Sequence, residues 1–289
     1  MMKPSPIEIE RLVRVALEED APWGDITSQS LIPERARVAA DLAAREPGVL
    51  CGEDVFIAAM SLTDPSVSTR FRIHDGDTFA KGDILATIEG PARAVLQAER
   101  VALNFAQRLS GIATLTAKYV AEAGGTKARI VDTRKTTPGL RLLERYAVRC
   151  GGGANHRFSL SDAVMAKDNH LAVLGKSLTQ AIQQARATLP HTTHFEVEVD
   201  SLDQIDEVLA AGVETIMLDN FTIAAMRAGV EKIAGRALVE ASGGITLDRI
   251  REIAATGIDI ISVGALTHSV QALDLGLDIQ PLGLDSRPQ

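Results

Sequence analysis

Cationic side chains are concentrated in one stretch of this acidic chain, beside glycine-rich turns. Residues 127–170 contain nine Lys or Arg and four Asp or Glu, although the whole chain has a formal net charge of −8. The cations that follow short apolar runs or glycines are Arg134, Lys135, Arg157 and Lys167. A strand that ends at such a residue delivers it into a pocket. Guanidinium forks and ammonium groups together suit a small ligand with several negative charges.

Two other features of this stretch allow simpler interpretations. Arg141, Glu144, Arg145 and Arg149 have helical spacing, which predicts a solvated helix face with interleaved signs. His156 follows three glycines, and a lone histidine is usually a satisfied polar residue. Because Arg157 and two other cationic strand ends accompany it, we expect His156 to join the anion pocket.

Acidic residues alternate along one predicted strand, as Glu196, Glu198 and Asp200. Alternate residues share one face of a strand, and unpaired carboxylates are not stable against an apolar layer. One interpretation pairs them with Lys167 or Arg134 inside a barrel, and for Glu196 it remains as good as any other. For Glu198 we favour a second, in which Glu198 and Asp219 accept hydrogen bonds from sugar hydroxyls or hold Mg²⁺ through water.

Glycine-containing turns follow the last two predicted strands, at Ser242-Gly243-Gly244 and Val263-Gly264-Ala265. Barrels often bind phosphate there through backbone N–H groups and helix N-termini, and glycine lets the backbone approach the anion closely. One such turn would be an ordinary strand–helix connection. Two at adjacent strands favour a phosphate site.

Short apolar runs alternate with helical patterns through the last two-thirds of the chain. The predicted strands are Ala128–Asp132, Ala163–Lys167, His194–Val199, Thr215–Asp219, Ala237–Ala241 and Asp259–Val263. Such repeated units predict a parallel sheet, and six of them favour a (β/α) barrel. A doubly wound open sheet is the alternative, but no Gly-x-Gly-x-x-Gly follows the first strand.

The first hundred residues predict an α+β arrangement. We expect a helix over Ile7–Glu19, strands over Val38–Ala44, Ser68–Ile73 and Asp83–Glu89, and a long helix over Ala92–Ala123 that bridges two domains.

The composition argues against several classes of protein. An acidic chain with 3% aromatic residues offers neither a basic face nor stacking platforms for nucleic acid. Cys51 and Cys150 are far apart and match no metal-ligand spacing, which favours a reduced, cytoplasmic protein. The first ten residues contain no apolar signal core, and no run approaches membrane-spanning length, so we expect no membrane association.

Motifs along nearly the whole chain resemble those of the quinolinate phosphoribosyltransferase family. In the second half they are Asp132–Arg141, Gly151–Arg157, Lys167–His170, Glu196–Asp200, Leu218–Phe221, Glu240–Ile245 and Ile261–Ala265. In the first half they are Glu19–Asp20, Gly24–Ser28, Ala98–Arg100, Leu103–Asn104 and Leu109–Ala113. The motifs are long and specific.

The resemblance implies an α/β protein with an N-terminal α/β sandwich and a C-terminal incomplete, TIM-like (β/α) barrel. We expect the sandwich domain over residues 1–112, joined by the tail 270–289, and the catalytic barrel over 113–269. The family implies an obligate homodimer, and further assembly into hexamers stays open.

The resemblance also implies the reaction and its residues. Quinolinate and phosphoribosyl pyrophosphate would give nicotinate mononucleotide, pyrophosphate and CO₂, with Mg²⁺ required. By motif match, the quinolinate carboxylates would be held by Arg134, Arg157 and Lys167 with His156 nearby, and by Arg100 of the partner subunit. Lys135, Glu198 and Asp219 would be catalytic and contact phosphoribosyl pyrophosphate and its Mg²⁺. The remaining substrate-binding positions are Thr133 and, around the 5′-phosphate, Ser242, Gly243, Gly244, Val263, Gly264 and Ala265.

Three alternatives remain. A related phosphoribosyltransferase would act on another pyridine or azine carboxylate, although two carboxylate clamps favour a dicarboxylic acid. A barrel aldolase would form a Schiff base at Lys167 or Lys135, but dense cations and the lack of an apolar lysine pocket argue against it. A non-enzymatic anion-binding scaffold would need no Glu198–Asp219 pair.

Overall fold

The computed structural model describes residues 3–284 and divides them into two compact units. The first unit contains residues 3–117, 136–152 and 270–284, and the second contains residues 118–135 and 153–269. The first of these divisions along the chain falls at 117/118, and residues 136–152 belong to the first unit. The expected domains, 1–112 with 270–289 and 113–269, stay a prediction.

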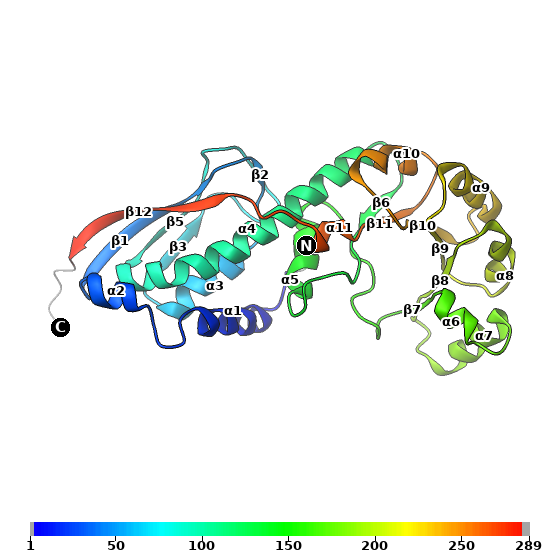
Figure 1. Ribbon diagram of the computed structural model, residues 1–289, viewed down its shortest axis with the longest axis horizontal. Helices are drawn as coiled ribbons and strands as arrows, with labels where there is room; N and C mark the ends of the chain where they lie inside the picture. Colours follow the sequence, from blue (N-terminus) through cyan, green and yellow to red (C-terminus); the bar gives the residue numbers. More distant parts are fainter. Residues whose placement is uncertain (1–2, 285–289) are drawn as a thin grey trace. The chain divides into compact units, whose positions relative to one another are not determined.

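An antiparallel sheet forms the centre of the first unit (Figure 1). Its strand order is β12 (Leu275–Leu284), β1 (Ala36–Ala44), β5 (Ile84–Pro91) and β3 (Ser68–Phe71). Two short strands, β2 (Gly48–Val49) and β4 (Thr78–Phe79), pair separately. Because β12 pairs with β1, the described part of the expected tail lies in this unit; residues 285–289 lie outside the described residues.

Five helices contribute to the first unit. They are α1 (Pro6–Asp20), α2 (Ile26–Leu31), α3 (Glu53–Thr63), α4 (Ala92–Glu122), which continues past residue 117, and α5 (Arg141–Cys150). Helix α3 contacts both α1 and β3, and its Phe56 and Met60 are fully buried. The predicted helices over 7–19 and 92–123 and the three predicted strands are confirmed, with ends that differ by at most two residues.

A parallel six-stranded sheet forms the second unit (Figure 1). Its strands are β6 (Arg129–Val131), β7 (Val164–Ala166), β8 (Phe195–Val199), β9 (Thr215–Asp219), β10 (Leu238–Ser242) and β11 (Ile260–Ser262). The spatial order β6-β11-β10-β9-β8-β7 follows the chain around a ring, except that β6 and β7 do not pair within the described residues. The predicted incomplete barrel is therefore confirmed, and the doubly wound sheet is excluded.

Short helices connect these strands. They are α6 (Asp168–Ala172), α7 (Leu178–Thr188), η1 (Leu202–Gln204), α8 (Ile205–Ala210), α9 (Ile223–Ile233), η2 (Leu247–Arg249), α10 (Ile250–Ala254) and α11 (Ala265–His268). Thr222 caps α9 by accepting a hydrogen bond from Ala225 N at 3.2 Å. The central strands are buried on both faces: Val197, Ile216 and Ala241 are fully buried, and the charged residues Glu196 and Glu240 at neighbouring positions are buried as well. No helix within residues 3–284 is both long and apolar enough to cross a membrane.

Helix α5 corrects one prediction, because its charged residues do not form a solvated face. Glu144 is fully buried and Arg145 is 7% exposed. Oε1 of Glu144 accepts hydrogen bonds from Arg108 Nε at 2.9 Å and Nη2 at 2.7 Å, and Oε2 accepts one from Thr137 N at 3.1 Å. Helical spacing is compatible with a buried ion pair to α4 as well as with a solvated face. The partner, Arg108, is 36 residues away in the sequence, so the local pattern could not distinguish the two.

Replacing Glu144 tests whether this buried pair stabilises the fold. Glu144→Ala leaves the Arg108 guanidinium without its carboxylate, so we expect the free energy of unfolding to fall by about 3 kcal/mol. Glu10→Ala is the matched control, since Glu10 pairs with Arg14 on the exposed face of α1 and its loss should cost less than about 0.5 kcal/mol. Urea unfolding of both variants measures the difference. Equal small losses would contradict the interpretation.

Candidate active site

A cavity of about 610 Å³ lies where the strands of the parallel sheet end. Most of the predicted site residues line it: Thr133, Arg134, Lys135, His156, Arg157, Lys167, Glu198, Asp219, Ser242, Gly243 and Gly244. Val263, Gly264 and Ala265 follow β11 but are not among the lining residues. Arg100 is an exposed residue of α4 in the first unit.

An ion pair in the cavity wall connects two neighbouring strands. Lys167 follows β7 and its Nζ lies 2.7 Å from Oε2 of Glu198 in β8. The Glu198 side chain is 14% exposed, whereas that of Lys167 is 44% exposed. Lys167 therefore compensates the charge of the mostly buried Glu198 carboxylate and still lines the cavity.

The turn after β10 approaches the end of β9 so closely that it requires glycine. Gly243 has a φ of +85°, and a Cβ there would lie 2.2 Å from Oδ1 of Asn220. Asn220 itself has a φ of 55°, and its Nδ2 donates to Oδ2 of Asp219 at 2.6 Å. Gly244 also has a left-handed φ of +56°. Glycine at both positions leaves the backbone N–H groups open to close approach by an anion.

The position of the Lys135 side chain depends on the glycine turn Val263–Ala265, although that turn does not line the cavity. A Cβ at Gly264 would lie 3.0 Å from Cδ of Lys135, so a larger residue would displace the lysine stem. The hydroxyl of Thr267 donates to the Lys135 carbonyl at 2.8 Å. The segment after β11 thus shapes the site by packing against Lys135.

A buried carboxylate holds the segment that carries His156 and Arg157. Asp132 is fully buried; it accepts a hydrogen bond from His156 N at 2.9 Å and another from Asn155 Nδ2 at 2.5 Å. Ala154 also forms a parallel bridge with Val131 in β6. The Arg157 guanidinium donates through Nη1 to the Ala163 carbonyl at 3.0 Å. Burial and the neighbouring charge of Arg134 lower the pKa of Arg157.

Two acidic side chains contact the His156 ring on the side of the strands away from the cavity opening. Nε2 of His156 lies 3.2 Å from Oε2 of Glu196 and 3.3 Å from Oε2 of Glu240. Of the two interpretations of the acidic residues, pairing with Lys167 therefore holds for Glu198, where it was the less favoured one, and Glu196 pairs with His156 instead. Glu196 lies two residues deeper along β8 than Glu198, where the histidine reaches it and the lysine pairs with Glu198 instead.

The acidic surroundings change the protonation of this cluster. Burial lowers the pKa of His156, but the hydrogen bonds and charges of Glu196 and Glu240 outweigh burial and raise it to about 10. Burial raises the pKa of Glu196. The cluster therefore retains a proton at neutral pH, shared between the imidazole and the carboxylates.

Several cavity residues were not predicted from the sequence as site residues. Met165, Met217, Asn220, Glu240 and Ser262 also line the cavity. Glu240 could have been recognised from the sequence, because a charged residue within an apolar strand needs a partner when the strand is buried. The methionines had none, since their pattern is that of ordinary core residues.

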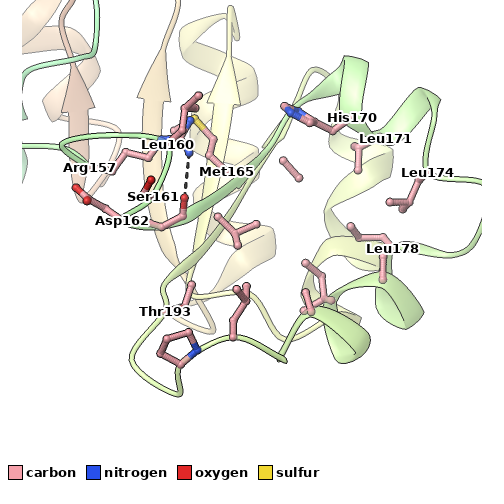
Figure 2. A pocket seen from close by; sticks show the side chains of 18 of the residues that line it. Arg157, Leu160, Ser161, Asp162, Met165, His170, Leu171, Leu174, Leu178 and Thr193 are labelled. Carbon is pink, nitrogen blue, oxygen red and sulfur yellow. Dashed lines mark hydrogen bonds between the residues drawn. The ribbon is translucent and has the colours of Figure 1, made fainter. Parts of the chain in front are cut away.

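A larger cavity of about 740 Å³ lies beside β7, α6 and α7, and Figure 2 shows it. Leu171, Leu174 and Leu178 line one side of it, and Arg157 and Asp162 lie at the other. This cavity lacks the convergent charges of the smaller one. The polar chemistry is concentrated at the strand ends.

The fold and the site together define an α/β-barrel protein with a mixed cationic and acidic pocket at the carboxyl ends of its strands. Family models agree with this class. The quinolinate phosphoribosyl transferase N-terminal domain matches residues 25–110, and the C-terminal domain of the same family matches residues 112–278. The chain belongs to the quinolinate phosphoribosyltransferase family.

Individual relatives support the assignment. The nicotinate-nucleotide pyrophosphorylase [carboxylating] of Mycobacterium leprae is 45% identical over 273 residues, covering 92% of this chain and 95% of the relative. A probable enzyme of the same name from Bacillus subtilis is 42% identical, covering 94% of each chain. The crystal structure of NadC from Streptococcus pyogenes is 43% identical, with a TM-score of 0.93 over 98% of this chain and 100% of that one.

Proposed function

We propose that this chain transfers the phosphoribosyl group of phosphoribosyl pyrophosphate to quinolinate. Decarboxylation then gives nicotinate mononucleotide, pyrophosphate and CO₂, a step of NAD biosynthesis. The observation that supports this most directly is the convergence of three cations and two carboxylates, Arg134, Arg157, Lys167, Glu198 and Asp219, around one cavity. Family membership makes this reaction the expected one.

The cationic side of the cavity suits the diacid. Arg134 and Arg157 offer planar forks matched to a carboxylate, and Lys167 offers a point charge for a second one. His156 stands beside Arg157 at the same wall. A monoacid such as nicotinate would leave part of this charge uncompensated, which favours quinolinate.

The acidic side suits the sugar phosphate. We propose that Glu198 and Asp219 face the ribose hydroxyls and Mg²⁺, that Lys135 faces the pyrophosphate, and that the Ser242–Gly244 turn receives the 5′-phosphate. Carboxylate oxygens are the ligands that Mg²⁺ prefers, and both carboxylates face this cavity, so the donor set fits the ion through water and substrate. When bound, Mg²⁺ would compensate negative charge on the pyrophosphate.

The residues then perform mainly positioning and electrostatic work. Departure of pyrophosphate leaves positive charge on the ribose, which the carboxylates of Glu198 and Asp219 tolerate, while Lys135 stabilises the leaving group. The cationic wall holds the pyridine nitrogen against the anomeric carbon. Once the nitrogen is bonded to ribose it is cationic, and it accepts the electron pair left by CO₂. The aldolase alternative gains no support, since Lys167 lies in an ion pair with Glu198.

We propose a homodimer in which the exposed Arg100 reaches the active site of the partner subunit. Its support is the motif around Arg100 together with a position that is exposed on α4 within its own unit. Arg100 would then complete the second carboxylate clamp with Lys167.

An assay of the purified chain tests the reaction. With quinolinate, phosphoribosyl pyrophosphate and Mg²⁺, we expect equal amounts of CO₂ and nicotinate mononucleotide. Nicotinate in place of quinolinate is the comparison and should give little mononucleotide. Faster turnover of nicotinate would favour the related phosphoribosyltransferase, and ligand binding without any turnover would favour the scaffold. Chelation of Mg²⁺ should abolish product formation if the metal is required.

Arg157→Ala should lower kcat/KM for quinolinate about 100-fold, which corresponds to roughly 3 kcal/mol, because a carboxylate loses a charge-assisted bidentate partner. Arg251→Ala is the matched control. Arg251 is an arginine of the same unit whose side chain is 79% exposed and pairs with Glu122. Near-normal turnover of the Arg157 variant would contradict the clamp.

Mixing two inactive variants tests the shared site. Dimers of Arg100→Ala with Arg157→Ala contain one doubly altered site and one intact site. Equal mixing of the two chains should therefore restore about a quarter of the sites. Steady-state rates after subunit exchange measure the recovery, with each variant alone as the control. No recovery in dimers verified as hybrids would contradict the role of Arg100.

A further inference from the structure

The His156 ring is held at both of its nitrogens by groups of its own unit. Nδ1 accepts a hydrogen bond from the backbone N–H of Arg157 at 2.7 Å. Nε2 faces Oε2 of Glu196 and of Glu240 at 3.2 and 3.3 Å. The ring therefore links two strands of the sheet, β8 and β10, to the backbone of a cavity arginine.

This cluster separates two cavities of the second unit. The site cavity of about 610 Å³ and a second cavity of about 330 Å³ are both lined by His156, Arg157 and Glu240. The second cavity is also lined by residues that begin strands, such as Thr215 and Leu238. The cluster thus forms the floor of the site inside the barrel.

The two carboxylates are buried at a cost that the fold alone does not explain. The side chains of Glu196 and Glu240 are 5% and 1% exposed, and Oε1 of each has no hydrogen-bond partner among the described residues. Apolar residues of similar size usually stabilise such interior positions at least as well. Retaining both acids points to a role in the site.

A metal ion is the first alternative, because these three side chains bring potential ligand atoms within 4.8 Å of one another. The hydrogen bond at Nδ1 argues against it. Nε2 carries a proton in either charge state of the ring: in the neutral form because Nδ1 accepts the Arg157 N–H, and in the imidazolium because both nitrogens are protonated. A nitrogen that carries a proton donates to carboxylates and does not ligate a metal.

We infer that Glu196 and Glu240 are positioning residues that fix the His156 ring through Nε2 and, through its contact with the Arg157 backbone, direct that arginine into the diacid side of the site. This inference rests on the proposed function. It assigns a positioning task to two acids through their contacts with His156. It also predicts that their loss weakens binding of the diacid more than binding of the sugar phosphate.

Substitution by leucine separates positioning from folding. Glu196→Leu with Glu240→Leu removes both acceptors while retaining bulk, and we expect KM for quinolinate to rise at least tenfold. KM for phosphoribosyl pyrophosphate and the melting temperature should change little. Gln at both positions keeps an acceptor for Nε2–H and should recover most of the affinity. Thr69→Val, which alters a buried strand hydroxyl of the first unit, is the control and should leave both KM values unchanged.

A double-mutant cycle identifies His156 as the intermediary. In a His156→Gln background the two leucines should have no further effect on KM for quinolinate, because the contact they remove is already absent. A crystal structure of the double-leucine variant should show the imidazole rotated, a result that does not depend on turnover. If the double variant does not fold, Glu240→Leu alone gives the same comparisons.

Three outcomes would overturn the inference. They are an unchanged KM for quinolinate in the folded double variant, equal losses for both substrates, and a stoichiometric metal ion that the double variant no longer binds. A failure of the proposed function is distinguishable from these, because it would appear in the unaltered chain as no turnover of quinolinate.

Discussion

Buried carboxylates in the parallel sheet require cationic or hydrogen-bonding partners, and this requirement organises the site. Asp132 and Glu198 lie at or near the carboxyl ends of their strands, Glu196 and Glu240 lie deeper in theirs, and all four are mostly or fully buried. An uncompensated charge there would destabilise the barrel. Each acid therefore pairs with a group of the segment around His156 or with Lys167, and these segments also carry cations of the cavity.

The sequence predicted the strands and the edge of the sheet that carries the chemistry. Apolar runs of strand length, buried on both faces, have few other stable arrangements, so the six strands of the barrel lie where expected. Carboxyl ends of parallel strands meet at one edge, which is why Arg134, Lys167 and Asp219 line the same cavity. These inferences needed only local pattern and a general rule of topology.

The identity of side-chain partners was not predictable in the same way, because it depends on reach across the fold. Glu196 and Glu198 have the same local pattern, yet one pairs with His156 and the other with Lys167. The neighbours of Cys51 and Cys150 were not predictable from the sequence either. Both are buried and lie with Asp75 in one small group, although nothing in their spacing indicates it. Burial raises the pKa of Cys51, which suits a core thiol better than a ligand.

The Lys167–Glu198 pair links the two halves of the proposed site. A quinolinate carboxylate that takes the Lys167 ammonium group competes with Glu198, which lies 2.7 Å away. The Glu198 carboxylate, no longer compensated by Lys167, would then present its full negative charge to the part of the cavity where the ribose becomes positive. Binding of the diacid and stabilisation of the sugar would thereby be coupled through one ion pair, without movement of the backbone. With the proposed roles, such coupling would account for an exposed lysine beside a mostly buried acid, where an apolar pair would stabilise the fold equally well.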